Sequence, residues 1–490
     1  MANEDSAGPR PRIAIIGGGI AGLAAAHRIV ELQPSCQLSL FESADRLGGV
    51  LSTLHADGFQ VERSADNFIT TLPWGLDLCR RLGLSDQLLQ TDARFRQTFI
   101  VFRGRLHKLP DGFLMMAPTR LWPLALTPLL SPWGKLRAAM EYFIPPRQDP
   151  SDESMADFVR RRMGREAFDR LVEPLVSAVY AADMERLSVL ATLPRFRDME
   201  REHGSLIRAM RRQRRTSRQT QRESGARYSM FVTLHDGLTA IVDAIAARLP
   251  PGSVRLRSAV TALNPATVAK GWEVQYSTLE AASGPSLPQT EHFDAVIVAA
   301  PSGTAARLIG PFDRLLADQL AGIEHSGTAI VSCGFDESQV GHPLDGMGAV
   351  VPAIEKSPLL AVSFSSRKYA HRAPPGKVLL RAFVGGARRP ELAEADEAEL
   401  VRMVIEQIKP LLRITGLPCF IDVARWPGTM PQYHVGHRLR VEQIDSLVGR
   451  HQGLFLAGNA YRGVGLPDCI HGGELAAESA IKAVGLDMAR

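Results

Sequence analysis

A chain of 490 residues is too long for one compact core, so two or three domains are expected. Its composition, with 45% hydrophobic and 22% charged residues, is typical of a globular protein. The five cysteines form no CxxC pair and no metal-ligand spacing, which excludes a disulfide framework and a metal site and favours a reducing compartment.

The first predicted element is an apolar strand at 12–16. It follows the polar residues "MANEDSAGPRP" rather than a secretory leader, so we expect a cytoplasmic location. A turn comes next, Gly17-Gly18-Gly19-Ile20-Ala21-Gly22, and then a segment with helical spacing. In such a GxGxxG fingerprint the first glycine permits the tight turn, the second lets the backbone approach a pyrophosphate, and the third lets the helix pack on the strand. The helix N-terminus adds N–H groups for the phosphates, so the turn predicts a dinucleotide site.

A second strand, "CQLSLFE", ends at Glu42, 20 residues after Gly22, where a carboxylate can accept hydrogen bonds from a ribose; Ser43 follows it. The continuation "ESADRLGGVLST" holds Arg46 and the pair Gly48-Gly49. It resembles the RxGG element of the flavin-dependent amine oxidase superfamily. The resemblance implies FAD rather than NAD, with Arg46 neutralising phosphate charge and the two glycines letting the main chain pass beside the cofactor.

An apolar region spans 113–146 and includes "LWPLALTPLLSPWG", fourteen uncharged residues with three prolines, too short and too interrupted to cross a bilayer as one helix. Either it is buried, or it lies on a membrane surface through the flanking residues Trp122, Trp133, Arg120, Lys135 and Arg137. Further along, 208–227 holds eight arginines and one glutamate, so the formal charge of +5 is a local feature. This insert is either a solvated loop or an acidic-lipid patch; without interleaved aromatic residues, nucleic acid is not an expected partner.

The remaining elements complete the nucleotide site. A helix is expected after Gly237, then a strand pair in which, by the same resemblance, the backbone of Val260 faces the adenine, and then the strand "FDAVIVAAP". Near the end, "LFLAGNAYRGVGLPDCI" reads as a strand, a second glycine-rich turn with Gly458 and Asn459, and a helix that begins near Asp468. The resemblance implies that Val464, Gly465 and Leu466 lie along the isoalloxazine, with the helix dipole directed at it.

Two segments identify the type of flavoprotein: "RWPGTMPQYHVGH" at 425–437 and "GNAYRGVGLPDCI" at 458–470 closely resemble the flavin-dependent porphyrinogen oxidases. The resemblance implies a six-electron oxidation of a porphyrinogen to a porphyrin in haem synthesis, with oxygen reoxidising the flavin. It implies no metal and no catalytic acid or base, because a hydride passes to the flavin. A transient ferrochelatase contact and peripheral attachment to the inner membrane face are further expectations. The substrate-facing positions implied by the family are Val350, Ser363, Phe383, Asp66 and Asn67.

The segment "GVGLPDCI" favours coproporphyrinogen III as the substrate, with protoporphyrinogen IX as the alternative. An amine oxidase or carotenoid desaturase shares the N-terminal fingerprint; amine oxidases that attach FAD covalently use a C-terminal cysteine, which invites comparison with Cys469. A non-catalytic flavin or porphyrin carrier is a third class.

The predicted fold is α/β. A discontinuous Rossmann-like FAD domain is expected at 10–95, 226–300 and 420–490, a mixed-sheet substrate domain at 301–419, and a helical, membrane-binding-like segment at 96–225.

Overall fold

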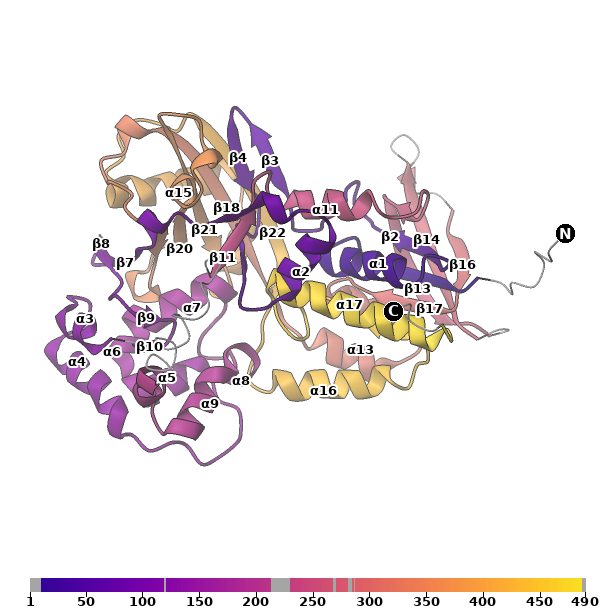
Figure 1. The fold of residues 1–490 in the computed structure, drawn as a ribbon, viewed down its shortest axis with the longest axis horizontal. Coiled ribbons are helices and arrows are strands. Elements are labelled where there is room, and N and C mark those ends of the chain that lie inside the picture. Colours follow the sequence, from indigo (N-terminus) through magenta and orange to yellow (C-terminus); the bar gives the residue numbers. More distant parts are fainter. Residues whose placement is uncertain are drawn as a thin grey trace.

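The computed structural model describes residues 10–118, 120–212, 230–267, 270–280, 284–285 and 287–486. The molecule is elongated, with a nucleotide-binding half near both termini and a second half that contains a large sheet and a group of helices (Figure 1). The Arg-rich insert falls almost entirely outside the described residues, which resume at residue 230.

A five-stranded parallel sheet organises the first half, in the order β12 (Val254–Arg255), β2 (Gln37–Phe41), β1 (Arg12–Ile16), β17 (Ala295–Val298) and β23 (Leu454–Leu456). Alternate residues of β1 enter different cores, as the strand period requires. Ile13 and Ile15 pack with α1 (Ile20–Leu32), α2 (Trp74–Arg81), α11 (Thr239–Ala246) and α17 (Leu466–Ala483). Ala14 and Ile16 pack with α12 (Ser302–Ile309), α13 (Arg314–Ala321), α16 (His437–Val448) and an antiparallel sheet. The latter sheet contains β13 (Ser258–Pro265), β14 (Trp272–Glu280), β15 (Gly284–Pro285) and β16 (Gln289–Phe293).

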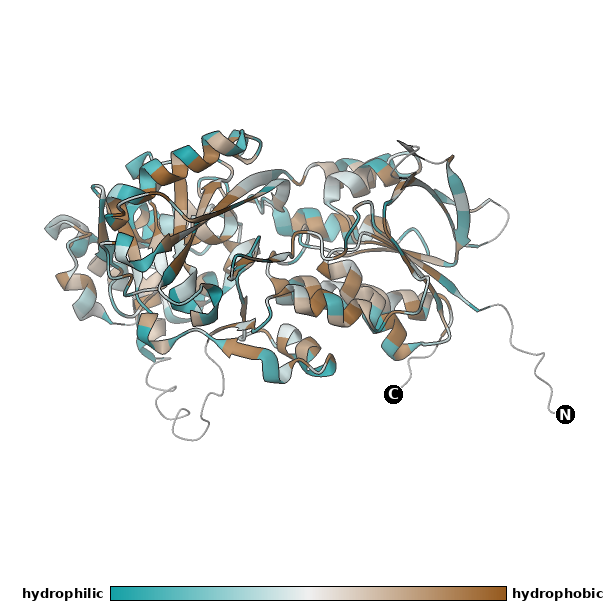
Figure 2. Cartoon of the chain, turned by 90° about the horizontal axis from the view of Figure 1, so that it is seen from above, coloured by the Kyte–Doolittle hydropathy of each residue, from teal (hydrophilic) through white to brown (hydrophobic). Residues whose placement is uncertain are grey.

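The second half is built on a seven-stranded mixed sheet, in the order β22 (Phe420–Pro431), β18 (His325–Asp336), β21 (Lys377–Gly385), β20 (Leu359–Phe364), β19 (Gly348–Val350), β7 (Thr98–Phe102) and β8 (Arg105–Lys108). One of its faces packs on α15 (Glu397–Leu412). Apolar residues run along the strands of both halves (Figure 2).

Three strands of this sheet differ from the predicted domain limits. We expected 96–225 to be helical, but β7 and β8 extend the seven-stranded sheet, and β22, expected in the FAD domain, pairs with β18. The physical reason is backbone hydrogen bonding: the edges of β18 and β19 need partners, and segments distant in sequence supply them. A short hairpin, β3 (Thr53–Ala56) with β4 (Phe59–Glu62), stands apart from these sheets. So does a small three-stranded sheet in the order β5 (Phe68–Ile69), β11 (Phe231–Leu234) and β6 (Leu88–Gln90). The domain division itself stays a prediction.

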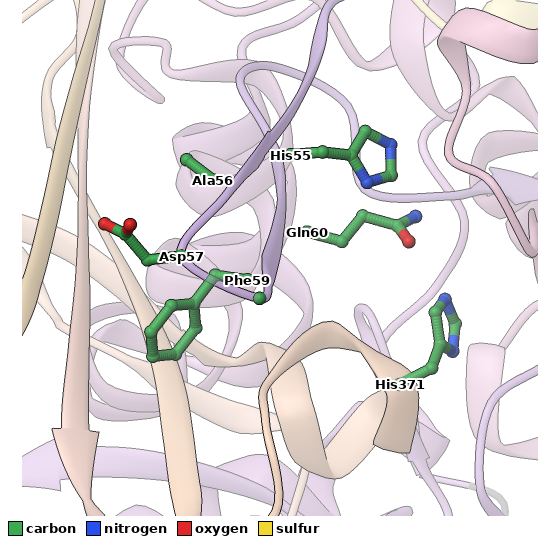
Figure 3. Close-up of a pocket in the computed structure, with 7 residues that line it drawn as sticks. His55, Ala56, Asp57, Phe59, Gln60 and His371 are labelled. Atoms are coloured by element: carbon green, nitrogen blue, oxygen red, sulfur yellow. The ribbon is translucent and has the colours of Figure 1, made fainter.

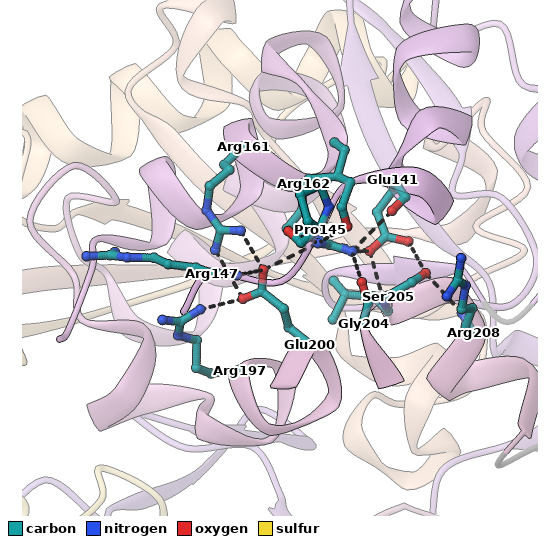
Figure 4. A network of polar contacts seen from close by, with 12 residues as sticks. Glu141, Pro145, Arg147, Arg161, Arg162, Arg197, Glu200, Gly204, Ser205 and Arg208 are labelled. Atoms are coloured by element: carbon teal, nitrogen blue, oxygen red, sulfur yellow. Dashed lines mark hydrogen bonds and ion pairs between the residues drawn. The ribbon is translucent and has the colours of Figure 1, made fainter. Parts of the chain in front are cut away.

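The helical segment includes α3 (Leu121–Leu126), α4 (Pro132–Ala139), α5 (Met155–Met163), α6 (Arg165–Ala167), α7 (Glu173–Tyr180), α8 (Val189–Thr192) and α9 (Pro194–His203). A buried polar network fastens it (Figure 4). Arg162 is fully buried and pairs with Glu141 and Glu200, while Arg161 and Arg197 also bind Glu200. Because arginines and carboxylates alternate around it, each buried charge has a partner.

Candidate active site

The two predicted glycine turns meet at one edge of the parallel sheet. Ile16 is in register with Val298, which is in register with Leu456. Strands that run parallel present their carboxyl ends at the same edge, so Gly17 and Gly458 emerge at one edge with β17 between their strands, although 441 positions separate them. The second turn therefore completes the first rather than forming a separate site.

The first turn depends on glycine at positions where a side chain has no room. Gly17 has a φ of 111°, and a Cβ there would stand 2.6 Å from the Ala299 carbonyl oxygen. A Cβ on Gly22 would stand 2.0 Å from the Gly17 carbonyl oxygen, which is the close packing of helix on strand that the fingerprint predicts. Gly19 differs, because no atom lies within 4 Å of its ideal Cβ position.

Glu42 and Arg46 hold the loops beside this turn. The Glu42 carboxylate accepts hydrogen bonds from Gly18 N (2.7 Å) and Ala44 N (2.8 Å), with Ser43 Oγ at 3.3 Å. Arg46 donates to the carbonyl oxygens of Leu47, Leu51 and Gly49. Its guanidinium thus stabilises its own loop. The predicted contact with the pyrophosphate would be a second role of the same side chain.

The Arg46 loop and the adenine strand adjoin the turn. Gly48 forms a parallel bridge with Gly19 and donates its N–H to the Gly18 carbonyl, and a Cβ on Gly49 would stand 3.2 Å from Gly19 Cα. On the other side, Ser258 N donates to the Glu42 carbonyl, which places Val260 two residues further along β13. These predicted cofactor residues therefore surround a single edge of the sheet.

Residues 429–437, here called the strap, hold the second turn. The Tyr433 hydroxyl donates to the Asn459 carbonyl and accepts from Gly463 N at 2.8 Å. Asn459 Nδ2 donates to the Thr429 carbonyl at 3.1 Å, and His437 Nε2 lies 3.0 Å from the Tyr461 carbonyl oxygen. The Tyr433 and His437 rings stack at 4.0 Å. Side chains from outside the turn thus determine its shape.

The residues present fit a dinucleotide cofactor. Gly19 and Gly458 leave open space where side chains would stand, and Gly19 and Gly465 are the N-caps of α1 and α17. The cap residue of α1 offers no side-chain acceptor, so the first N–H groups of this helix are available to a ligand. At α17, Pro467 has no N–H and the Asp468 carboxylate accepts from the backbone of Gly465 and Asp468, so Leu466 supplies the N–H for a ligand there. Ile20, Ala21 and Leu466 belong to these first turns, and Val464 packs against the apolar core of the helical segment.

The predicted substrate residues of the large sheet share one face. Val350 is opposite Ala361, and Ala361 is opposite Phe383; Ser363 is opposite Arg381. Directly opposed residues point to the same side of a sheet, and Arg381 and Phe383 are two apart on β21. Val350, Ser363 and Phe383 therefore lie on the face away from α15, and Val350 packs on the same apolar cluster as Val464.

Asp66 lies in a charged cluster beside that face. Its carboxylate is 3.3 Å from Lys368 Nζ, 3.3 Å from Arg381 Nη1 and 3.7 Å from Arg372 Nη1. Burial alone would raise the pKa of Asp66, but the three cations hold that pKa below its usual range. Asn67 lies beside Tyr369, in contact with its hydroxyl group. Sequence reasoning missed the three cations, although "SSRKYAHRAPPGKVLLRAFVGG" contains them all.

Other parts of the chain offer less support for a site. Burial and the neighbouring Asp468 raise the pKa of the Cys469 thiol to about 12, so it is un-ionised at neutral pH. A pocket of about 310 Å3 beside the β3–β4 hairpin is lined by His55, Gln60 and His371 among others (Figure 3), and no predicted cofactor or substrate residue lines it. Among the described residues, no group of three or more His, Cys, Asp or Glu side chains is placed to hold a metal ion.

The parallel sheet, the two glycine turns and the helix N-termini that face them define a dinucleotide-dependent oxidoreductase. The family model described as flavin-containing amine oxidoreductase matches residues 20–481, and the chain belongs to this family. It is an oxidoreductase whose cofactor is FAD.

Individual relatives are similar over nearly their whole length. The chain is 34% identical to coproporphyrinogen III oxidase of Bacillus subtilis (strain 168), covering 96% of this chain and 98% of that protein. It is also 34% identical to coproporphyrinogen III oxidase of Propionibacterium freudenreichii, covering 99% and 94%. A crystal structure from Exiguobacterium sp. 255-15, assigned as a protoporphyrinogen oxidase, has a TM-score of 0.84 and 29% identity, covering 96% and 99%.

Proposed function

We propose that the chain oxidises a porphyrinogen to a porphyrin, with coproporphyrinogen III as the preferred substrate and protoporphyrinogen IX as the alternative. The observation that carries this proposal is the 34% identity, over nearly the full length of both chains, to two coproporphyrinogen III oxidases. The structure assigned as a protoporphyrinogen oxidase keeps the alternative open.

The chain's own residues have two tasks in this proposal. FAD, when bound, accepts the electrons and passes them to molecular oxygen. The glycine turns hold its phosphates, and the strap fixes the turn that carries Val464, Gly465 and Leu466. Val350, Ser363 and Phe383 offer one face of the sheet to the tetrapyrrole, against which the Phe383 ring can lie by shape and dispersion. Pyrrole N–H protons leave to solvent, and no side chain is assigned as a catalytic acid or base.

Turnover of the purified protein tests the proposal. Each porphyrinogen is supplied separately under air, and the porphyrin formed is followed by its fluorescence while oxygen uptake is recorded. We expect oxygen uptake with both and a higher kcat/KM for coproporphyrinogen III. Flavin that is present without oxygen uptake would instead indicate a carrier, and oxidation of an amine would indicate the amine oxidase class.

We also propose that the helical segment contacts a membrane surface. Its exposed apolar residues support this: Trp122, Trp133 and Phe143 are 74%, 79% and 78% exposed. Among the described helices, none has both the length and the apolar character needed to span a bilayer. Arg137, predicted at the edge of this surface, instead donates to the carbonyl oxygens of Arg160, Arg161 and Arg162. Interfacial binding through tryptophan side chains does not require Arg137.

Sedimentation with anionic lipid vesicles tests this contact. The double variant Trp122→Ser/Trp133→Ser should lose most of its binding, whereas Leu439→Ser, at a 65% exposed apolar site on α16, should keep it. Equal binding of both variants would exclude this surface as the docking site. We also propose a transient contact with a ferrochelatase, which would receive the porphyrin; this proposal rests on the family resemblance.

A further inference from the structure

Five charged side chains meet where the end of β4 and the residues that follow it, 62–66, approach β21 and α14 (Ser365–Lys368). This group, here called the seam cluster, contains Glu62, Asp66, Lys368, Arg372 and Arg381. Asp66 is shared by all three cations, and Glu62 lies 3.1 Å from Arg372 Nη1. The cluster lies between residues that follow the first glycine turn and the face of the large sheet that carries the predicted substrate residues.

The seam cluster has more positive than negative charge. Three cations face two carboxylates, and Asp422, the next carboxylate on β22, is already 3.0 Å from Arg63. Burial raises the pKa of Glu62, although Arg372 and the Leu238 N–H oppose this effect. Because protonation of Glu62 removes a negative charge, the raised pKa can only enlarge the positive excess. Both arginines are fully buried. An unbalanced charge in such a place is costly unless an anion completes it.

Hydrogen bonding within the seam cluster is also incomplete. Arg381 donates to the Ser64 carbonyl at 2.6 Å and Arg372 donates to Thr233 Oγ1 at 3.0 Å. Among the described residues, the Nε atoms of Arg372 and Arg381 are buried without a hydrogen-bond partner. The two buried guanidinium groups are thus not fully neutralised or hydrogen-bonded within the cluster. The third cation, Lys368, can therefore accept a further anionic partner.

Lys368 is the member through which a ligand can meet this charge. Its side chain is 17% exposed, compared with 9% for Asp66 and none for either arginine. Its ammonium group is 3.3 Å from Asp66 Oδ2 and carries three donors, more than that one contact uses. Asp66 itself holds this ammonium group in place, because the carboxylate is fixed from the other side by the arginines.

The position of the cluster connects it to the substrate face. Arg381 is opposite Ser363 on the neighbouring strand, and its guanidinium carbon is 5.2 Å from the Phe383 ring centre. Lys368 is five residues beyond Ser363, at the end of the helix that directly follows β20. The seam cluster is therefore connected to the strands β20 and β21 that carry Ser363 and Phe383.

We propose that Lys368, oriented by Asp66 and supported by the excess charge of Arg372 and Arg381, binds a carboxylate of the substrate and selects the tetracarboxylate over the dicarboxylate. This inference rests on the proposed porphyrinogen oxidation. A coproporphyrinogen has a propionate on every ring, whereas a protoporphyrinogen has vinyl groups on two rings. A vinyl group at Lys368 would leave the ammonium group unpaired, and a site built for a charged partner rejects an analogue that lacks it.

The test compares holoenzymes of the wild type, Lys368→Gln, Lys368→Arg and Lys377→Gln. Lys377 is a matched control, because it pairs with an aspartate, Asp336 at 2.8 Å, near the start of the same β21 strand. Lys368→Gln leaves two arginines against two carboxylates, so it removes the excess positive charge and the fold should persist; bound flavin and Tm check this. The probes are coproporphyrin III, protoporphyrin IX and the tetramethyl ester of coproporphyrin III, titrated by fluorescence at two ionic strengths.

For Lys368→Gln we expect about tenfold weaker binding of coproporphyrin III, as for the loss of one charge-assisted hydrogen bond. Binding of the tetramethyl ester should not change, and the kcat/KM ratio of coproporphyrinogen to protoporphyrinogen should fall by a similar factor. Lys368→Arg and Lys377→Gln should resemble the wild type. Equal coproporphyrin III binding by the two Lys→Gln variants would overturn the inference.

The remaining outcomes separate this inference from the proposed function. If the wild type oxidises neither porphyrinogen, the proposed function fails. If Lys368→Gln loses flavin or stability, the test uses the wild type and Lys368→Arg instead. Both must bind coproporphyrin III more tightly than its tetramethyl ester, and salt must weaken that preference. A wild type that binds ester and acid equally well would overturn the role of Lys368 while leaving the oxidation intact.

Discussion

The two glycine turns of the cofactor site are held in different ways. In the first turn, Gly22 is required by the Gly17 carbonyl oxygen and Gly17 by the backbone of Ala299, which follows the neighbouring strand β17, so backbone packing holds this turn. The second turn is held by Tyr433 and Thr429, which come from a strap on another strand. The strap is in turn bound to the helical segment, where Ser188 N donates to the Tyr433 carbonyl. A turn held by backbone packing needs glycine and the neighbouring strand, whereas a turn held by side chains also needs the strap and the helical segment.

The largest expected effect on stability comes from disturbing the contact between α1 and α17, the helices that follow the two turns. Gly473 lets α17 lie against α1, because a Cβ there would stand 2.1 Å from the Ala21 carbonyl oxygen. Gly473→Ala should lower the free energy of unfolding by about 3 kcal/mol through overpacking and should reduce the flavin content. The adjacent Gly472 has open space at its Cβ, so Gly472→Ala should stabilise the protein by about 1 kcal/mol through helix propensity. Urea unfolding measures both, and similar effects would contradict the close packing.

The next effect concerns ligand binding at the first turn alone. Gly19→Ala adds a methyl group where the protein has no neighbouring atom, so Tm of the flavin-free protein should stay within about 1 °C of the wild type. FAD affinity should fall by about a hundredfold, or ~2.7 kcal/mol, because the methyl group blocks the approach of the phosphates. Titration of flavin-free protein with FAD provides the measurement. Unchanged affinity would remove Gly19 from the cofactor site.

A smaller effect is expected at the second turn. Tyr433→Phe removes one hydroxyl that serves the Asn459 carbonyl and the Gly463 N–H, both of which belong to the turn. Leaving these groups unpaired should cost about 2 kcal/mol of stability and weaken FAD binding several-fold, with a shift in the flavin absorption bands. As a control, Tyr276→Phe removes a hydroxyl that bonds side chains of the antiparallel sheet, and should leave the flavin spectrum unchanged.

The smallest expected effect is the pH dependence of the strap. Burial lowers the pKa of His437 to about 4, with Arg440 and His434 acting in the same direction and Asp152 and the Tyr461 carbonyl opposing. The unfolded chain therefore binds a proton that the folded protein refuses between about pH 6.5 and 4, so stability falls as the pH falls through this window. From pH 7.5 to 5.5 the contribution is about 1 kcal/mol. Unfolding of His437→Gln should show a correspondingly shallower acid slope than the wild type; equal slopes would assign the acid sensitivity to other groups.

The comparison of turns also explains how far the sequence could be interpreted. Gly17, Gly19 and Gly22 occur at fixed spacing after an apolar strand, so this strand–turn–helix unit can be recognised within a short stretch of chain. The predicted α/β fold, flavin family and cofactor are confirmed. The residue-level cofactor and substrate assignments stay predictions. β7 and β22 could not be placed correctly, because the strand that each pairs with lies far away in the sequence.

By itself, the sequence determined the flavin fingerprint, because glycine sterics and strand ends act over about twenty residues. Only the tertiary structure decided that Tyr433 supports the second turn, and that Lys368, Arg372 and Arg381 share Asp66. Hydrogen bonds and ion pairs depend on distances of a few ångströms between side chains. Residues separated by hundreds of positions acquire such distances only when the whole chain has folded.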